Sequence, residues 1–222
     1  MRLALQRWWY RRRLPSGPLR TLLEASLPDR SRVVAATSFL AIDLETTGLD
    51  ARTDQIVSIG SVPIVEGRIR LSEARYRVLR IEGSVNRSAT IHGLRDRDVQ
   101  HGEALEDVLP GLLNQLTDAV LLSHHAPFDL AFLNAACRRL YGGPLLVPVT
   151  DTLTLARTAL HVRGVAVPKG GFRLAALRAR YGLPPLQAHH ALADALAAAE
   201  LFLALIAHQG GTDRVRLGDV LR

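Results

Sequence analysis

The alternation of apolar and polar positions predicts strands in the first part of the chain. Apolar or alternating runs that fit strands lie at Phe39–Glu45, Gln55–Val65 and Arg68–Leu79. Glu66 and Gly67 separate the second run from the third and favour a hairpin turn. We therefore expect three antiparallel strands at the start of the domain.

Beyond residue 100 the apolar positions recur mostly with helical spacing, and short apolar runs lie between the helical segments. Antiparallel strands followed by alternating helices and strands predict an α/β fold, a mixed sheet flanked by helices. The expected strands lie at 119–123 and near 146–149, and the expected helices lie near 105–116, 127–141, 152–160, 174–181 and 190–208.

The composition fits a globular chain and excludes several other classes. Of 222 residues, 48% are apolar and 22% are charged, which excludes a disordered or collagen-like chain. The single cysteine, Cys137, excludes a disulfide scaffold and fits a reducing compartment, so we expect a cytoplasmic protein. The longest apolar stretch, Ala191–Ala207, contains Asp194 and Glu200, and we therefore expect no transmembrane segment. No apolar run follows the first arginines, so no secretion signal is expected.

The positive charge is concentrated at the start of the chain. The whole chain carries a net charge of +7, and residues 1–38 hold eight arginines but only two acidic residues, a net charge of +6. This difference predicts three parts: a basic arm at 1–38, a domain at 39–209 and a short tail at 210–222.

Aromatic residues accompany the arginines of the predicted arm. Trp8, Trp9 and Tyr10 stand among five arginines, and aromatic rings stack on bases while guanidinium groups pair with phosphates. The arm could therefore clamp a single strand. Leu3, Arg7 and Tyr10 share one side of a helix, so packing against the domain or a protein partner such as a polymerase is an alternative. Binding to an anionic membrane surface is another.

Two carboxylates lie on one face of the first predicted strand. Asp43 and Glu45 are two residues apart, so their side chains leave the same face, whereas Ile42 and Leu44 point to the other. Like charges this close cost free energy unless a cation lies between them, and oxygen ligands suit magnesium or manganese. The alternative is a solvated strand end.

Two more acidic residues lie on predicted helices. Asp129 stands in a first turn, where the helix dipole favours an acid in any protein, but it shares its face with Phe132 and Leu133. Asp194 stands in a nearly all-apolar helix with no lysine or arginine within a turn. An unpaired buried carboxylate is costly, so a metal ion is its candidate partner.

His189 precedes Asp194 by five residues and belongs to the preceding loop if the helix begins after it. From that loop its ring can turn over a metal held by Asp194 and take a proton from the attacking water. The alternative is that His189 or His190 caps or packs locally. A structural zinc site is not expected, because the histidines lack the regular spacing of such sites and Cys137 stands alone.

Five separated motifs carry a family resemblance. They are residues 41–49 (AIDLETTGL), 91–94 (IHGL), 123–129 (SHHAPFD), 150–153 (TDTL) and 189–194 (HHALAD). In this order they resemble the DEDDh (DnaQ-like) 3′-to-5′ exonucleases, the family that contains the proofreading epsilon subunit of bacterial DNA polymerase III. The resemblance runs from Phe39 to Gln209. It departs at His125, where asparagine is usual, and at Pro63, which indicates an edge or a bulge in its strand.

The resemblance implies an RNase H-like fold and a hydrolase that releases nucleoside monophosphates with two Mg²⁺ or Mn²⁺ ions. Asp43 would bridge both ions, Glu45 and Asp194 would complete the first metal site, and Asp129 would hold the second ion directly or through water. His189 would be the general base.

Further roles are expected around this centre. Thr46, Thr47 and Gly48 directly follow the catalytic strand and are placed to contact the terminal nucleotide. The resemblance adds His92 to this group. We interpret Asp151 as the N-cap of the helix that begins at 152 rather than as a catalytic residue.

The expected partner is the 3′ end of a nucleic acid, and single-stranded DNA is our first prediction. The same catalytic arrangement also serves exoribonucleases and oligoribonucleases, which is the first alternative. The second alternative is a non-catalytic nucleic-acid-binding or polymerase-associated module of this fold. The sequence gives no indication of the oligomeric state.

Overall fold

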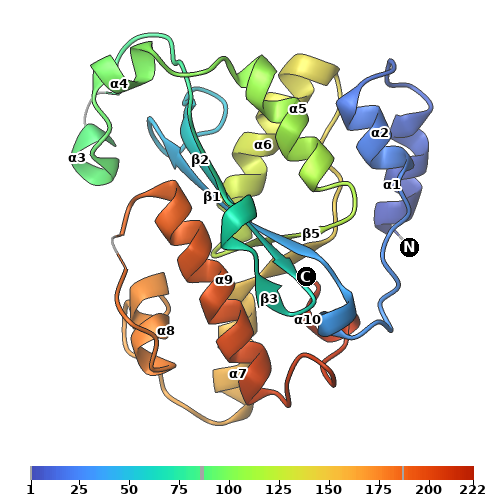
Figure 1. Ribbon diagram of the computed structural model, residues 1–222, viewed down its shortest axis with the longest axis vertical. Coiled ribbons are helices and arrows are strands. Elements are labelled where there is room, and N and C mark those ends of the chain that lie inside the picture. Colours follow the sequence, from blue (N-terminus) through green and yellow to red (C-terminus); the bar gives the residue numbers. More distant parts are fainter. Residues whose placement is uncertain (1, 86–87, 187) are drawn as a thin grey trace.

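The computed structural model describes residues 2–85, 88–186 and 188–222, and in this part of the chain six strands form one sheet (Figure 1). The strand order is β3-β2-β1-β5-β6, and β4 also pairs with β2. Because β1 is antiparallel to β2 and parallel to β5, the sheet is mixed, as the sequence predicts. The strands are β1 (Phe39–Thr46), β2 (Ile56–Val65), β3 (Arg68–Ile69), β4 (Arg75–Val78), β5 (Val120–Ser123) and β6 (Val149–Asp151).

The predicted hairpin turn is confirmed, but the strand after it is shorter than expected. Glu66 and Gly67 have φ values of 53° and 67°, as a type I′ turn requires. The predicted strand Arg68–Leu79 is wrong as one element, because the short 3₁₀ helix η2 (Leu71–Glu73) divides it into β3 and β4. Pro63 of β2 lies between the stretches that pair with these two strands, so its missing N–H interrupts no ladder there.

The last strand is shifted relative to the prediction. Sequence pattern places it near 146–149, whereas β6 begins at Val149 and ends at Asp151. Pro144 and Pro148 flank the apolar residues before it, and a proline cannot donate a ladder hydrogen bond. The apolar run therefore packs in the core as a loop, through Leu145 and Val147.

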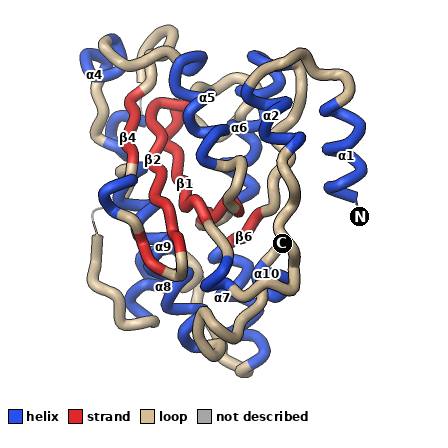
Figure 2. The backbone as a smooth tube through the Cα atoms, turned by 45° about the vertical axis from the view of Figure 1, so that its right-hand side comes forward, coloured by secondary structure: helices blue, strands red, loops and turns tan. Residues whose placement is uncertain are grey.

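Helices cover both faces of the sheet. Figures 1 and 2 show α9 on one face, with α7 and α8 beside it, while α5, α6 and α2 cover the opposite face. The five helices predicted beyond residue 100 are present, with ends shifted by one or two residues. The helices are α1 (Arg2–Arg11), α2 (Pro18–Glu24), α3 (Ala89–His92), α4 (Asp96–Gln100), α5 (Leu105–Gln115), α6 (Ala126–Tyr141), α7 (Thr152–Val162), α8 (Leu174–Arg180), α9 (Ala191–His208) and α10 (Leu217–Val220).

The alternation of β1 divides the core into two layers. Leu40, Ile42 and Leu44 belong to the cluster that contains the leucines of α5 and the inner face of α6. Phe39 and Ala41 belong to the cluster that contains the inner face of α9. The next side chains on that second face are Asp43 and Glu45, so β1 directs both carboxylates toward α9.

The long helix α9 is apolar enough and long enough to cross a membrane. Half of it is buried inside the domain, where Ala195, Ala199 and Phe202 pack on the sheet. Leu201 and Leu205 pack instead against α7 and α8. A core helix passes the same length and composition test, and this packing identifies α9 as one.

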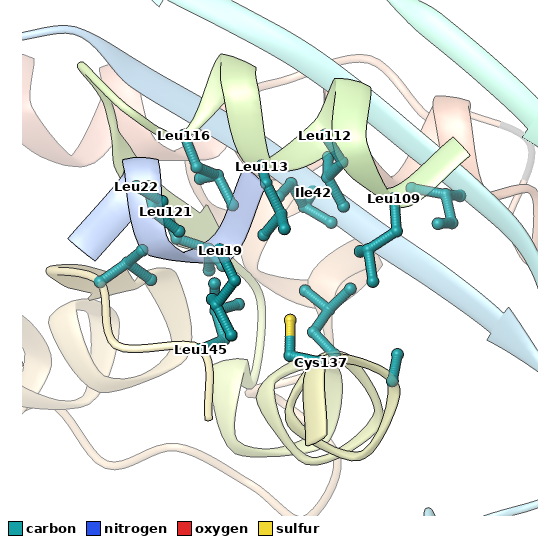
Figure 3. Packing of buried hydrophobic residues seen from close by; sticks show 14 of the residues in the cluster. Leu19, Leu22, Ile42, Leu109, Leu112, Leu113, Leu116, Leu121, Cys137 and Leu145 are labelled. Atoms are coloured by element: carbon teal, nitrogen blue, oxygen red, sulfur yellow. The ribbon is translucent and has the colours of Figure 1, made fainter. Parts of the chain in front are cut away.

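The leading segment is packed against the domain. Leu19 and Leu22 of α2 lie among the leucines of α5 (Figure 3). The Arg7 side chain is buried, and its guanidinium donates to the carbonyls of Leu146 (2.8 Å), Leu22 (2.6 Å) and Ala25 (2.7 Å). The charge boundary near residue 38 therefore does not coincide with a boundary in packing.

The last residues also belong to the core. Val215, Leu217 and Val220 pack in the cluster under α9. The backbone N–H of Arg222 donates to the carbonyl of Val149 (2.9 Å). The segment 210–222, expected as a tail, thus covers the end of the sheet at β6.

Candidate active site

A close approach between β2 and α9 brings two acidic segments together. Gly60 of β2 lies opposite Asp43 of β1. A Cβ atom at Gly60 would lie 2.2 Å from the carbonyl carbon of Ala191, the first residue of α9. Only glycine allows the helix to start this close to the sheet, and three residues later α9 presents Asp194 to the β1 carboxylates.

Asp43, Glu45 and Asp194 form a group that could hold a metal ion. One carboxylate oxygen from each residue lies within 4.8 Å of the other two. Three hard oxygen ligands in this spacing are the type that Mg²⁺ and Mn²⁺ prefer. The structure thus brings together three of the four carboxylates that the sequence singles out.

The fourth carboxylate, Asp129, lies nearby but outside that group. It is buried in the first turn of α6, and Ser123 Oγ donates a hydrogen bond to its Oδ2. Its charge helps to raise the pKa values of Asp43 and Glu45, so the four carboxylates share one electrostatic site.

All four carboxyl groups hold their protons more tightly than usual. Burial raises the pKa of Glu45 to about 7, and the charges of Asp194 and Asp129 add to this shift. Burial also raises the pKa of Asp129 to about 7. The pKa of Asp43 is raised well above its usual value by burial and then by its three acidic neighbours. Raised carboxyl pKa values of this kind indicate missing positive charge, which a divalent cation would supply.

The pKa of Asp194 is also raised, although two effects on it oppose each other. Burial raises it, while hydrogen bonds from the backbone N–H groups of His189 and His190 lower it. The bond from His189 to Asp194 Oδ2 measures 2.7 Å. This contact joins the loop before α9 to the carboxylate in the first turn of the helix.

The two histidines before α9 differ in their surroundings. His189 is exposed, has a φ of 63° and lines the same cleft as Asp43 and Asp194. His190 is the N-cap residue of α9, and its ring stacks on Tyr76 with centroids 4.4 Å apart. The sequence leaves local packing open as an alternative role for either histidine. In the structure it is His190 that packs locally.

The residues after Asp43 and Glu45 form a hydrogen-bonded loop. Thr46 Oγ1 donates to the carbonyl of Gly48 (2.6 Å), and Thr47 Oγ1 donates to Asp54 Oδ1 (3.3 Å). A Cβ atom at Gly48 would lie 2.5 Å from the Asp54 carboxylate, so glycine keeps this loop tight. His92 ends α3, and its side chain lies outside the described part of the structure.

The interpretation of Asp151 as a helix cap is confirmed. Its side chain accepts hydrogen bonds from the backbone N–H of Leu153 (3.0 Å) and from Thr154 Oγ1 (3.0 Å). It also accepts from the backbone N–H of His125 (2.9 Å), which ties the start of α7 to the start of α6.

A cleft of about 1040 Å³ opens beside the acidic group. Its walls include Asp43, Asp194 and His189 together with basic and aromatic side chains that the sequence reading did not single out. Those side chains are Arg157, Phe172 and Arg173, contributed by α7 and by the turn before α8. These three residues belong to none of the five sequence motifs, and only the fold places them next to the carboxylates.

Comparisons with known proteins agree with this geometry. A family model described as Exonuclease (RNase_T) matches residues 40–202. The chain is 32% identical over 182 residues to a DNA polymerase III PolC-type of Thermotoga maritima, which covers 82% of this chain but only 13% of that protein. The chain thus spans about an eighth of the length of this polymerase relative.

Solved structures of nucleases share the fold. The nuclease domain of 3′hExo, a DEDDh family member bound to rAMP, matches with a TM-score of 0.64 and 16% identity, over 80% of this chain and 94% of that one. Exonuclease X in complex with 5′ overhanging duplex DNA matches with a TM-score of 0.61 and 24% identity, over 82% and 98%. At these identities the likeness concerns the fold alone, and it confirms the expected RNase H-like architecture.

Proposed function

This chain belongs to the exonuclease family and is a DnaQ-like 3′-to-5′ exonuclease, and from that premise we propose that its substrate is DNA, preferably single-stranded. It would hydrolyse the last phosphodiester bond and release a nucleoside monophosphate. The observation that carries the proposed hydrolysis is the convergence of Asp43, Glu45 and Asp194 in one group, together with His189, which lines the same cleft as Asp43 and Asp194.

The carboxylates would divide between two divalent ions, Mg²⁺ or Mn²⁺. Asp43, Glu45 and Asp194 offer three oxygen ligands for the first ion, and Asp129 with Asp43 would hold the second. When bound, the two ions stabilise the charge that develops on the attacking and leaving oxygens. The raised carboxyl pKa values support this assignment, because cations would lower them and keep the groups ionised.

His189 would act as the general base. Its exposed ring lies on the loop that donates a hydrogen bond to Asp194, within the cleft that contains Asp43. It would take one proton from the attacking water while the water oxygen bonds to phosphorus. The bond between phosphorus and the O3′ of the retained strand breaks, and that oxygen leaves with a proton from solvent.

The choice of DNA rests on the relatives rather than on the site. The PolC-type match is a DNA polymerase, and exonuclease X is described in complex with DNA. The 3′hExo structure instead contains rAMP, so an exoribonuclease is the alternative within this fold. We also propose a cytoplasmic location, which suits the buried free thiol of Cys137.

The exposed face of α1 supports a partner surface in residues 1–38. The guanidinium groups of Arg12 and Arg13 lie 4.0 and 3.7 Å from the ring centroids of Trp8 and Trp9, and both indoles are exposed. Figures 1 and 2 show α1 at the edge of the α2 and α5 layer, on the side away from α8. This position favours a protein partner such as a polymerase over a clamp on the strand that enters the cleft.

Matched oligonucleotides labelled at the 5′ end test the proposed function. We expect single-stranded DNA to shorten from its 3′ end with Mg²⁺ or Mn²⁺, faster than duplex DNA or RNA of the same sequence, and not to shorten with EDTA. Asp43→Asn should abolish cleavage, while Asp118→Asn, which changes an exposed acid far from the site, should not. Preferential cleavage of RNA would overturn the choice of DNA, and a fully active Asp43→Asn variant would overturn the metal assignment.

A further inference from the structure

The cleft is larger than one reacting nucleotide requires, and several of its lining residues have no role in the proposed hydrolysis. Its volume of about 1040 Å³ is at the upper end of the roughly 300–1,000 Å³ of small-molecule sites, so one reacting nucleotide would not fill it. The loop Thr46–Gly48, to which we assign the terminal nucleotide, is not among the residues that line this cleft. The wall that carries Arg157, Phe172 and Arg173 is therefore available to another part of the substrate.

This wall is held rigidly to the catalytic side of the sheet. His124 follows β5, and its Nε2 donates to the carbonyl of Phe172 (3.1 Å) while its Nδ1 lies 2.8 Å from Thr152 Oγ1. The N–H of Arg173 donates to the carbonyl of Gly170 (3.0 Å), which closes a turn before α8. His124 thus ties the aromatic residue to the segment between β5 and Asp129.

The arginines of this wall differ from the third arginine that lines the cleft. Arg178 is buried, forms an ion pair with Glu200 (2.7 Å) and donates to the carbonyls of Ala197 and Pro184, so its role is structural. Arg157 and Arg173 are exposed, and neither forms an ion pair within the part of the chain that the structure describes. Their guanidinium groups are free to bind an anion.

The aromatic ring lies beside one of these free charges. The guanidinium carbon of Arg157 is 5.2 Å from the ring centroid of Phe172. An aromatic face next to guanidinium groups is the combination that binds single strands, since bases stack on rings and arginines pair with phosphates. Among the described residues that line this cleft, the only acidic side chains are those of the candidate metal ligands Asp43 and Asp194.

We propose that Arg157, Phe172 and Arg173 form a subsite for the retained strand, on the 5′ side of the scissile phosphate. The two guanidinium groups bind its phosphates and the Phe172 ring stacks on one of its bases. This inference rests on the proposed function, because it concerns the same substrate. The three residues would position the strand and would take no part in bond cleavage.

Two substrates separate this subsite from the catalytic centre. A single-stranded oligodeoxynucleotide fills both, whereas the p-nitrophenyl ester of thymidine 5′-monophosphate offers a terminal nucleotide without a retained strand. The variants are Arg157→Ala, Arg173→Ala and Phe172→Leu. Arg163→Ala is the matched control, because Arg163 is exposed on α7's C-terminal end and lines a different hollow.

We expect each subsite variant to raise KM for the oligonucleotide about fivefold or more, with kcat nearly unchanged, and to leave hydrolysis of the ester unaltered. Each arginine variant should also reduce the slope of log(1/KM) against log[salt] by about 0.7, as expected for one lost phosphate contact on a single strand. Arg173→Lys should restore most of that slope, and Arg163→Ala should change neither parameter.

The outcomes distinguish the two proposals. Wild-type protein that cleaves neither substrate with Mg²⁺ or Mn²⁺ would overturn the proposed function and the subsite with it. Wild-type protein that cleaves both, with variants that leave the oligonucleotide KM unchanged, would overturn the subsite alone. Variants that slow ester hydrolysis as much as oligonucleotide hydrolysis would also overturn it, because they would show a role at the reacting nucleotide.

Discussion

At the scale of single residues, some properties of the candidate site can be predicted from the sequence pattern and others cannot. The placement of Asp43 and Glu45 on one face follows from strand alternation alone, and β1 shows it. The isolation of Asp194 in an apolar helix correctly indicates an unusual carboxylate, since its pKa is raised. The helix face that Asp129 shares with Phe132 and Leu133 indicates its burial, but its hydrogen-bond partner, Ser123 of β5, could not be predicted from the helix alone.

The raised carboxyl pKa values predict how stability depends on pH in the absence of metal. Because the folded-state pKa of Glu45 is about 7, above its value of 4.5 in an unfolded chain, the folded state binds more protons between these two values. The stability contribution of this group is therefore fully present below about pH 4.5 and is lost as the pH rises through 7. Asp129 contributes with the same sign.

We expect the Tm of the protein in EDTA to fall between pH 5 and pH 8, as measured by differential scanning calorimetry. Glu45→Gln should flatten this dependence, because glutamine does not titrate. Mg²⁺ or Mn²⁺ should raise the Tm at pH 8 more than at pH 5, since protons and metal compete for the same oxygens. A Tm that rises with pH in EDTA would contradict the electrostatic description of the site.

His189 and His190 give opposite predictions although they are adjacent. His189→Ala should lower kcat by about 10²- to 10⁴-fold and leave the metal-induced rise in Tm intact, as expected for the loss of a general base. His190→Ala removes the stacking on Tyr76 and should cost about 0.5–1.5 kcal/mol of unfolding free energy, with a smaller effect on kcat. If the two variants exchange these effects, His190 rather than His189 is the base.

At the scale of elements, the sequence predicts the long, strongly periodic segments well and the short ones less well. The ends of α5, α6, α8 and α9 lie within one or two residues of the prediction. The errors occur at η2 and β6, where prolines or exposed turn residues interrupt an apolar run. The Arg178–Glu200 ion pair between α8 and α9 could not be predicted, because helical periodicity does not say which helices become neighbours.

The contact between β2 and α9 gives an element-scale prediction. Gly60→Ala places a methyl group 2.2 Å from the Ala191 backbone, so α9 must move away from the sheet and take Asp194 with it. We expect a loss of roughly 1–3 kcal/mol in unfolding free energy and a larger loss of the metal-induced stabilisation. Urea denaturation with and without Mg²⁺ measures both the unfolding free energy and the metal-induced stabilisation.

Gly111→Ala is the control for this substitution. Gly111 lies inside α5, and a Cβ atom there would meet no other atom within 4 Å, so alanine should stabilise the protein by about 1 kcal/mol. Metal binding should be unchanged in this control. A Gly60→Ala protein with full metal-induced stabilisation would show that the close approach does not position Asp194.

At the scale of the whole molecule, charge distribution was a poor guide to packing. The basic segment 1–38 differs sharply in charge from the rest, yet Leu14, Leu19, Leu22 and Leu23 are core residues. The reason is that most of the arginines in this segment are exposed, whereas these leucines pack in the core. Sequence alone does show that Leu3, Arg7 and Tyr10 share a side, and that side faces the domain through Arg7.

The buried guanidinium of Arg7 gives a prediction that separates packing from partner binding. Arg7→Ala removes the donor to the carbonyls of Leu22, Ala25 and Leu146, which join α1 and α2 to the loop before β6. Hydrogen bonds to charged groups contribute about 1.5–3 kcal/mol each, but they are not additive, so we expect a loss of about 2–4 kcal/mol in urea denaturation. Arg12→Ala removes the same charge from the exposed residue directly after α1 and should cost little stability, because the Arg12 guanidinium lies over the exposed Trp8 ring. Removal of residues 1–38 should be more severe than either, because it uncovers the leucines of α5. A truncated protein as stable as the full chain would show that the segment is an independent arm, and its exposed tryptophans would then have to serve a function other than packing.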